Sequence, residues 1–308
     1  MSERCDVVVI GAGLGGLGAA CVLARAGKQV VVLEHHTVPG GYAHDFTRKG
    51  FHFEVALHAL DGVAPGGWAY PLLRELGVLD RVEFVRLDPF YTATFPRHEI
   101  TAHADPTAYE GELLSLFPHE RDGIRSLIDA MVGAWSDTRR FSIDGQLGVR
   151  PPFAEIPMRY PRMVDAMSTS WDEYMARHLS DPEAKAVFST LWGYFGLPPS
   201  RLNAATFVLP WVSYHFFGAW YPKGRSMALS RALEADLVDH GGSIRYRQTV
   251  EHIEIDGDAA VAVTTEHGDR FEAEAVVSNA NPRDTITFAG IDAFPDEYIK
   301  RVVDPPVS

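Results

Sequence analysis

The first part of the chain alternates between apolar runs and glycine-rich turns, a pattern that predicts a strand, a turn, a helix and a second strand. Residues 7–10 (VVVI) form a continuous run of β-branched side chains, as expected of a parallel strand buried on both faces. Apolar residues then recur at helical spacing from Leu14 to Ala24, and Gly27 provides the expected end of that helix. A second apolar run, residues 30–33, predicts a neighbouring buried strand.

The pattern further along the chain is mixed and predicts several more helices and strands. Residues 42–62 look strand-like, with Gly50 as a turn, and Pro118 separates two expected helices. Helical periodicity covers residues 69–79, 105–135, 169–195 and 226–237. Strand patterns cover residues 243–246, 250–255, 260–266 and 270–275. Residues 142–162 are rich in Gly and Pro, so we expect an irregular or mobile loop there.

Aromatic side chains gather in residues 207–221, FVLPWVSYHFFGAWY, which carry no formal charge. Clustered aromatic residues are large contributors to ordinary protein cores. The same composition also suits a surface that faces a lipid or a lipophilic substrate. The sequence leaves both interpretations open.

Three glycines between the first strand and the first helix have the spacing G-x-G-x-x-G. Gly11 permits a sharp turn, Gly13 leaves room for a pyrophosphate, and Gly16 lets the helix pack closely on the sheet. The N-terminus of the helix then offers unpaired N–H groups and the positive end of its dipole to a diphosphate. The turn therefore predicts a dinucleotide site that requires no basic side chain.

Glu34 stands at the carboxyl end of the second predicted strand. A carboxylate at this position accepts hydrogen bonds from both ribose hydroxyls of an adenosine and repels a 2′-phosphate, which disfavours NADP. On this hypothesis Glu34 does not pack the core, and its removal should change fold stability little. The alternative is a structural Glu34 paired with Arg48 or Lys49.

Several stretches resemble one group of flavoproteins. Glu34, followed after five residues by Gly40-Gly41, resembles the extended fingerprint of flavoproteins with two dinucleotide-binding domains, which implies FAD rather than NAD. Three longer stretches are similar to segments of phytoene desaturases, carotenoid isomerases and retinol saturases: residues 50–60 (GFHFEVALHAL), 220–253 and 275–285 (AVVSNANPRDT). The resemblance runs along nearly the whole chain.

The candidate cofactor-binding residues follow from the glycine turn and from this resemblance. They are Gly11, Ala12, Gly13, Gly15, Gly16, Glu34, His35, Gly40, Gly41, Tyr42 and Val250. Tyr42 departs from the family pattern, because many relatives have an arginine after the double glycine. No catalytic residue is identified: His58 matches a histidine of the retinol-saturase-like pattern, and either a contact to flavin or substrate or a plain hydrogen-bonded role is open. The pair His35-His36 predicts no metal site, because neighbouring side chains at a strand end point in opposite directions.

The resemblance implies an α/β fold with a Rossmann-type FAD-binding domain of the glutathione-reductase kind. We expect this domain to be assembled from residues 1–62 and 220–286, with a strand at residues 275–278 returning to it. A mixed α+β substrate domain, residues 63–219 and 287–308, is expected as the insertion. Relatives carry more substrate domain and then a C-terminal FAD-binding segment, so we expect the fold to be C-terminally incomplete.

Two functions are compatible with the sequence. The first is an FAD-dependent oxidoreductase that desaturates, saturates or isomerises C=C bonds in a lipophilic polyene or isoprenoid. The second is a non-catalytic or partner-dependent FAD- or ADP-binding half of a split or truncated flavoprotein, completed by a partner chain. Motifs of hydrolases, zinc proteases and P-loop NTPases do not occur in the chain.

Composition narrows the partners and the setting. The formal charge of −13 over 308 residues excludes a nucleic-acid partner, because phosphate binding needs a concentrated basic surface. Only Cys5 and Cys21 are present, which favours a reducing cytoplasm over a disulfide framework. No apolar run reaches transmembrane length, so any membrane contact is expected to be peripheral.

Overall fold

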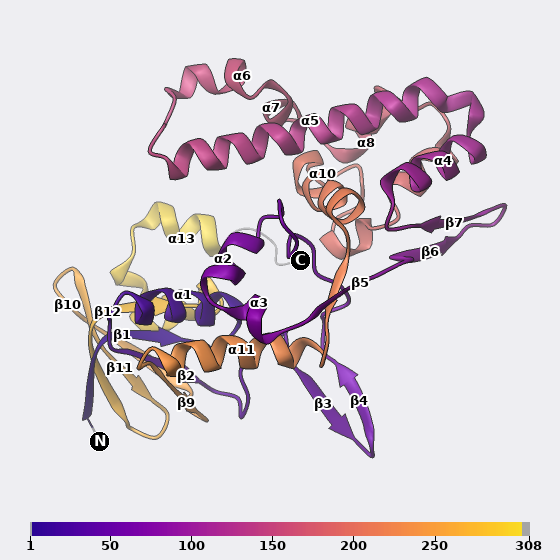
Figure 1. Ribbon diagram of the computed structural model, residues 1–308. Coiled ribbons are helices and arrows are strands. Elements are labelled where there is room, and N and C mark those ends of the chain that lie inside the picture. The colour runs from indigo at the N-terminus through magenta and orange to yellow at the C-terminus, as the bar shows by residue number, and fades with distance from the viewer. Residues whose placement is uncertain (1, 304–308) are drawn as a thin grey trace. The chain divides into compact units, whose positions relative to one another are not determined.

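The computed structural model describes residues 2–303 and divides the chain into two compact units (Figure 1). Unit 1 comprises residues 2–59, 71–85 and 221–303, and unit 2 comprises residues 60–70 and 86–220. Strands β5 (Phe84–Arg86) and β8 (Trp220–Pro222) carry the chain from one unit to the other and back.

Unit 1 is built on a six-stranded sheet with the strand order β10-β11-β12-β1-β2-β9. Its strands are β1 (Ser2–Ile10), β2 (Val30–Glu34), β9 (Ser243–Tyr246), β10 (Val250–Asp256), β11 (Ala259–Thr265) and β12 (Arg270–Ser278). The strands β12, β1, β2 and β9 run parallel, whereas β10 and β11 form an antiparallel extension. The central strand β1 is buried on both faces, since Val8 and Val9 are inaccessible to solvent. The expected α/β fold with a Rossmann-type arrangement is confirmed.

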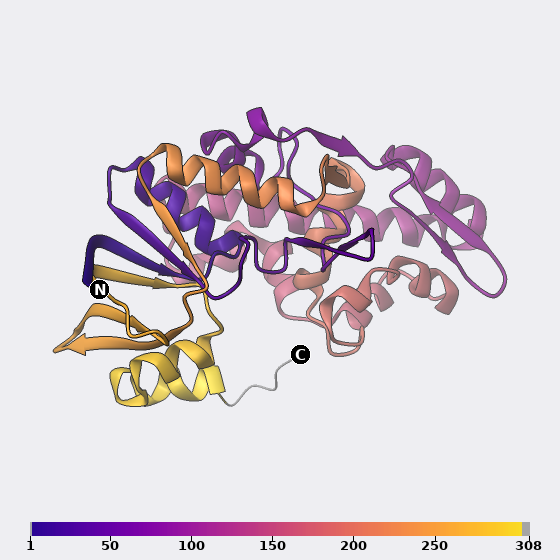
Figure 2. The ribbon, with the colours of Figure 1, turned by 90° about the horizontal axis from the view of Figure 1, so that it is seen from below.

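Helices cover both faces of this sheet (Figure 2). Helices α1 (Leu14–Arg25) and α11 (Ser226–Asp239) contact strands of the sheet, as does α12 (Pro282–Ala289). The other helices of this part of the chain are α2 (Tyr70–Glu75), α3 (Val78–Arg81), η5 (Ile291–Ala293) and α13 (Asp296–Val303). Helices α1 and α11 pack against each other. On the other face, Phe288 and Ala289 of α12 pack against an apolar cluster that includes Val8 and Ile10.

The compact units differ in part from the expected domain boundaries, which stay a prediction. Residues 60–62, expected in the FAD-binding domain, belong to unit 2, whereas residues 71–85 and 287–303, expected in the inserted domain, belong to unit 1. The physical reason is apolar packing: Leu76 and Val78 are buried, α3 packs on α11, and Phe288 joins the apolar cluster of the sheet. Residues 304–308, also assigned to that domain, lie outside the described residues.

Unit 2 is mainly helical and adds the two-stranded sheet of β6 (Tyr91–Thr94) and β7 (Glu99–Ala102). Its helices are α4 (Pro106–Leu116), η1 (Pro118–Glu120), α5 (Arg121–Gln146), η2 (Phe153–Glu155), α6 (Ile156–Arg159), α7 (Pro161–Met167), α8 (Trp171–Ala176), α9 (Pro182–Phe188), η3 (Trp192–Phe195), α10 (Ala204–Val212) and the π-helical turn η4 (Ser213–Phe217). The break at Pro118 is as expected. The capping box of Ser170 and Glu173 starts α8.

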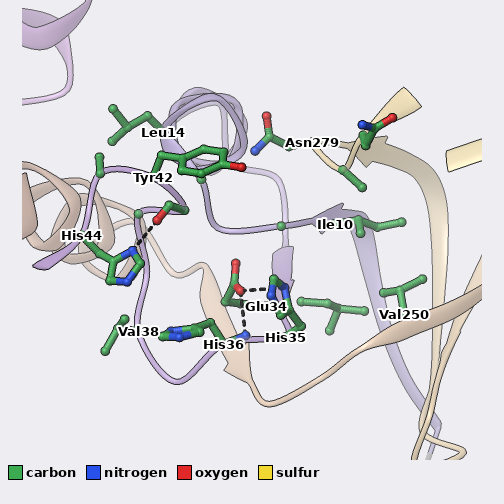
Figure 3. Close-up of a pocket in the computed structure, with 18 of the residues that line it drawn as sticks. Ile10, Leu14, Glu34, His35, His36, Val38, Tyr42, His44, Val250 and Asn279 are labelled. Carbon is green, nitrogen blue, oxygen red and sulfur yellow. Dashed lines mark hydrogen bonds and ion pairs between the residues drawn. The ribbon is translucent and has the colours of Figure 1, made fainter. Parts of the chain in front are cut away.

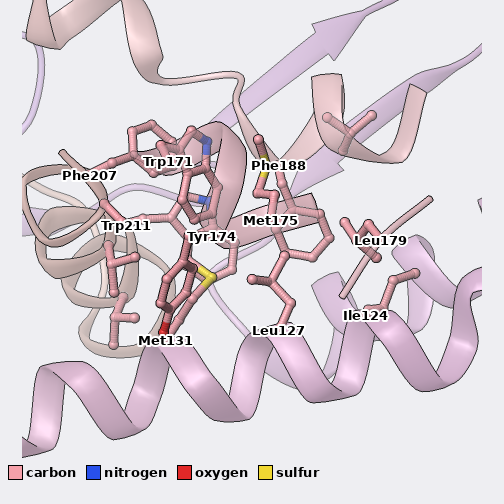
Figure 4. Close-up of a cluster of buried hydrophobic side chains, with 14 of the residues drawn as sticks. Ile124, Leu127, Met131, Trp171, Tyr174, Met175, Leu179, Phe188, Phe207 and Trp211 are labelled. Atoms are coloured by element: carbon pink, nitrogen blue, oxygen red, sulfur yellow. The ribbon is translucent and has the colours of Figure 1, made fainter. Parts of the chain in front are cut away.

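The aromatic segment that the sequence left open belongs mainly to the core of unit 2. Phe207 is inaccessible to solvent, and Trp211 and His215 are almost so. Phe207 stacks on Trp171 with 4.5 Å between ring centroids. Figure 4 shows this cluster over the long helix α5. The core interpretation therefore holds for the buried residues of this segment.

Two local expectations are wrong. Residues 142–162 are not an irregular loop, because α5 extends to Gln146 and η2, α6 and α7 follow. Both α6 and α7 have a proline in their first turn. The backbone N–H that proline lacks has no intrahelical partner at that position, so proline is well tolerated at the start of a helix. The strand-like stretch is also shorter than expected: β3 (Asp45–Arg48) and β4 (Phe51–Glu54) form a hairpin around Gly50, and the strand ends at Glu54.

No helix within residues 2–303 combines the length and the apolar character needed to cross a bilayer.

Candidate cofactor site

A cavity of about 790 Å³ lies in unit 1, where the carboxyl ends of β1, β2 and β12 meet (Figure 3). This is the edge at which parallel α/β sheets bind their ligands, and the volume falls in the range of ligand sites. The predicted residues that line it are Gly11, Gly13, Glu34, His35, Gly40, Gly41, Tyr42 and Val250. The other three predicted residues, Ala12, Gly15 and Gly16, are not among the lining residues.

The glycine turn is the strand-to-helix turn that its spacing predicts. Gly11 has a φ of +91°, which favours glycine. A Cβ on Gly16 would lie 2.1 Å from the carbonyl oxygen of Gly11, so only glycine lets α1 begin this close to the strand. Gly13 caps α1 without any side-chain hydrogen bond, and no acidic residue occupies the first turn. The N–H groups at this helix end are therefore left for a ligand.

The double glycine, Gly40-Gly41, contacts the glycine turn through backbone atoms. The N–H of Gly40 donates to the carbonyl of Ala12 at 2.7 Å, and Gly13 and Gly40 form an isolated β-bridge. A Cβ on Gly41 would lie 3.2 Å from the Cα of Gly13. Both glycines also have a positive φ. The fingerprint spacing thus reflects a close approach of two backbone segments at the rim of the cavity.

Glu34 is held by backbone donors at the floor of the cavity. Its Oε2 accepts from the N–H of Ala12 and its Oε1 from the N–H of His36, both at 2.7 Å, and Nδ1 of His35 lies 3.2 Å from Oε1. Only 4% of the residue is exposed. Because each carboxylate oxygen can accept more than one hydrogen bond, capacity remains for ribose hydroxyls.

This geometry changes two expectations about Glu34. The structural alternative paired it with Arg48 or Lys49, but its recorded partners are backbone N–H groups and His35. It is also buried rather than peripheral, so its removal affects the fold as well as the cofactor. The carboxylate therefore joins the glycine turn to the end of β2 before any ligand binds.

Polar residues that were not predicted reach the cavity from the segment after β12. Asn279 follows β12, and its N–H donates to the carbonyl of Ile10 at 2.8 Å. Its side chain lies over the turn: a Cβ on Gly13 or Gly15 would come within 2.8 or 2.7 Å of it. Asn281 and Asp284 also line the cavity. Their position directly after a strand of the sheet was the available signal, because strand ends of a parallel sheet meet at one edge.

Other lining residues were missed on the opposite side. His36 and His44 follow β2, and Gln248 and Thr249 precede Val250. The Oε1 atom of Gln248 is buried without a hydrogen-bond partner within the described residues. Such an acceptor at the wall of a cavity fits a ligand that carries donors.

Of the two residues Tyr42 and His58, only Tyr42 lines the cavity. Tyr42 lines the cavity and is 81% exposed, so the position at which relatives have arginine is occupied by an open, neutral side chain. His58 lies in a bend after β4, not in a strand as expected, and it is not among the lining residues. A catalytic role for His58 stays a hypothesis.

The residues present fit FAD. No lysine or arginine is among the lining residues, so the uncapped end of α1 is the positive element that faces a diphosphate. The Glu34 carboxylate provides an acceptor for ribose hydroxyls, and the orphaned Gln248 oxygen provides another acceptor. Apolar side chains such as Ile10, Leu33 and Val250 supply surface for a ring system.

The family profile of flavin-containing amine oxidoreductases matches residues 14–285. The chain belongs to this family. Membership confirms the predicted flavin cofactor, FAD. The chain is similar to a prolycopene isomerase of Daucus carota, with 27% identity over 299 residues that cover 92% of this chain and 47% of the relative. It is 30% identical to a phytoene dehydrogenase of Streptomyces griseus over 278 residues, 88% of this chain and 53% of the relative.

A solved structure of an oxidoreductase from Methanosarcina mazei shows the same fold. Its TM-score is 0.68 at 23% identity, and the match covers 99% of this chain and 64% of that chain. The chain spans about half the length of the curated relatives that it matches.

Proposed function

We propose that this chain binds FAD in the unit 1 cavity and takes part in redox or isomerisation chemistry at C=C bonds of a lipophilic polyene or isoprenoid. The observation that carries the proposal is the joint placement of the uncapped α1 terminus and the Glu34 carboxylate on one cavity without a basic side chain. Family membership supports the cofactor. The names of two relatives, a prolycopene isomerase and a phytoene dehydrogenase, support the substrate class.

The residues of the chain have binding and orienting roles in this proposal. The N–H groups at the start of α1 bind the diphosphate, and Glu34 accepts from the ribose of the adenosine. Asn279, which lies over the glycine turn, offers an amide to the same region. When bound, FAD supplies the hydride acceptor or donor, so no side-chain acid or base is required for hydride transfer itself.

The cellular compartment and the partners of the chain are part of the same proposal. We place the chain in a reducing compartment such as the cytoplasm, because Cys5 and Cys21 are both free and buried. Peripheral contact with a membrane fits a lipophilic substrate. A partner chain could complete the FAD site, and the experiment below distinguishes this arrangement from a chain that is active alone.

The proposal is tested by titrating the purified chain with FAD and recording the flavin spectrum, followed by anaerobic mixing with phytoene, lycopene isomers and retinol. We expect saturable FAD binding and a change in flavin absorbance with at least one polyene. A chain that binds FAD but, with its flavin either oxidised or chemically reduced, neither changes the flavin spectrum nor yields a new polyene product on chromatography would overturn the substrate class. A chain that turns over alone would exclude the need for a partner, whereas failure to bind FAD would overturn the cofactor role of the cavity.

A further inference from the structure

One end of unit 2 exposes several apolar side chains that lie close together in the sequence. We call residues 139–159 the tip; it comprises the end of α5, η2, α6 and the connection between them, which lie together in Figure 1. Phe153 is 89% exposed, and Leu147 and Met158 are 73% and 76% exposed. Three further exposed apolar residues of the tip are Phe141, Ile143 and Val149. Single exposed apolar residues are ordinary, whereas six of them within one 21-residue end of a unit suggest an interaction surface.

The tip is basic in an acidic chain. Its arginines are Arg139, Arg140, Arg150 and Arg159, and its acidic residues are Asp144 and Glu155. Asp144 accepts from the hydroxyl of Tyr160 at 2.5 Å, Glu155 pairs with Arg159 at 2.9 Å, and Arg140 lies 3.6 Å from Asp137, just outside the tip. Arg139 and Arg150 have no ion pair among the described residues, so they are the arginines left for a partner. The chain as a whole carries −13, so this local excess of positive charge runs against the composition.

The tip is held in place by contacts on its inner side. Tyr160 is buried, and its ring meets that of Phe141 at 5.3 Å between centroids. The guanidinium of Arg140 lies over the same ring at 4.9 Å. The exposed apolar residues therefore project from a packed base rather than from an unstructured segment.

We propose that the tip docks on an anionic lipid bilayer. Phe153, Leu147 and Met158 would enter the boundary between headgroups and acyl chains, while Arg139 and Arg150 contact lipid phosphates. The combination of protruding apolar side chains and surrounding arginines is the pattern of interfacial membrane binding. The inference rests on the proposed function in one respect, since a lipophilic substrate would dissolve in the same bilayer.

Charge argues against a second copy of the chain as the occupant. A two-fold dimer through the tip would place the same patch on both partners and bring arginines against arginines. An anionic bilayer instead supplies the complementary charge over an extended surface.

The test is flotation of the full chain with vesicles of phosphatidylcholine alone and with vesicles that contain roughly one-third phosphatidylglycerol. We expect binding to the anionic vesicles and its loss in high salt. The double substitution Phe153→Asp and Met158→Asp should lower the partition coefficient by at least about tenfold. Arg150→Gln should lower it by about fivefold. The matched control Ile291→Asp, at an apolar position of unit 1 that is 59% exposed, should leave it unchanged.

A second measurement does not depend on a disruptive substitution. Phe153→Trp should make fluorescence sensitive to quenching by brominated lipids, whereas Ile291→Trp should not. The proposal is overturned if wild type binds neither vesicle, or if the double variant binds as wild type does. It is also overturned if wild type is a dimer in size-exclusion chromatography that the double variant converts to monomer. FAD titration of the same variants keeps this result separate from the proposed function, because the cofactor cavity lies entirely in unit 1.

Discussion

At the scale of single residues, Glu34 carries two tasks that are usually discussed apart. It accepts from two backbone N–H groups in the described structure, and it is the proposed acceptor for the adenosine ribose. The first task fixes where the glycine turn lies relative to the end of β2. The second task uses the lone pairs that remain. The effect of a substitution at Glu34 should therefore be measured both on the free energy of unfolding and on the affinity for FAD.

We predict that Glu34→Ala lowers the free energy of unfolding by about 2 kcal/mol, because the N–H groups of Ala12 and His36 lose their acceptor. FAD affinity should fall at least about tenfold through the lost charge-assisted hydrogen bonds. Chemical denaturation without ligand and FAD titration measure the two effects. An unchanged FAD affinity in a folded variant would remove the ribose role of Glu34.

Two glycines of α1 give a matched pair for the second prediction. Gly16→Ala places a methyl group against the backbone oxygen of Gly11, which cannot move away without shifting the turn, so we expect a loss of about 1 to 3 kcal/mol and weaker FAD binding. Gly18→Ala meets no atom within 4 Å and should be neutral or stabilise by about 0.5 to 1 kcal/mol. Thermal melts and FAD titration of both variants test this. Equal behaviour of the two would contradict the close-packing role of Gly16.

At the scale of elements, the helices and strands that could be predicted from the sequence are those whose pattern lies within one short stretch of residues. The segment from β1 through the glycine turn and α1 to β2 follows from neighbouring residues. The bounds of α1 and β2 lie within one residue of their expected places, whereas β1 begins at Ser2, five residues before its expected start. The helices between residues 153 and 167 were missed, because Pro157 and Pro161 suggested a loop although they occupy first helical turns. Composition alone does not say on which side of a proline a helix lies.

The cofactor site shows the same division. Glu34 and the glycines were found because they belong to one continuous stretch. Asn279 and Gln248 were missed because their approach to the turn depends on how β12 and the chain before β10 return to the sheet. That return is set by long-range strand pairing, for which a single sequence carries little signal.

The π-helical turn η4 supplies the third prediction, through His215. This ring stacks on Trp211 at 4.0 Å and on Tyr109 at 4.9 Å between centroids. Its Nδ1 bonds to the carbonyl of Trp211 at 2.8 Å, and its Nε2 lies 3.1 Å from the hydroxyl of Tyr91. Burial lowers the pKa of His215 from its ordinary value of 6.5 to about 4.

Because the folded pKa is the lower one, the unfolded chain binds the additional proton between pH 6.5 and 4. The contribution of His215 is therefore fully present above pH 6.5 and is lost as the pH falls, with a loss approaching about 3 kcal/mol near pH 4. Tyr91 and Tyr109, which face the ring, have a raised pKa and do not titrate in this window. Denaturant unfolding at pH 7.5, 6 and 5 should show a steeper decline for wild type than for His215→Gln. Parallel declines would show that His215 does not titrate as described.

At the scale of the whole molecule, the two units have separate apolar cores. The core cluster of unit 2 gathers side chains from α4, α5, α8, α9 and α10, whereas that of the sheet in unit 1 includes Val8, Val31 and Phe271. The cofactor cavity is lined by residues of unit 1 alone. Stability of unit 2 and cofactor affinity should thus be separable by substitution.

The fourth prediction uses this separation. Phe207→Ala should cost about 3 to 5 kcal/mol, because the side chain is inaccessible to solvent and stacks on Trp171 in the core of unit 2. FAD affinity should stay within about twofold of wild type, well below the tenfold that 1.4 kcal/mol would produce. Calorimetry and FAD titration below the melting temperature of the variant provide the comparison. A proportional loss of affinity would show that the site depends on the integrity of unit 2.

The pairing of β1 with β12 has a consequence for synthesis on the ribosome. Val7 to Ile10 of β1 pair in register with Ala275 to Ser278 of β12. The edge of β1 that pairs with β12 therefore stays unpaired until β12, one of the last strands, has been synthesised. Every residue of unit 2 leaves the exit tunnel in the interval. The nascent chain therefore carries an uncovered, strongly apolar strand edge through most of its translation, which is a template for mispairing. A stalled or prematurely terminated product that lacks β12 should depend on chaperones far more than the finished chain does.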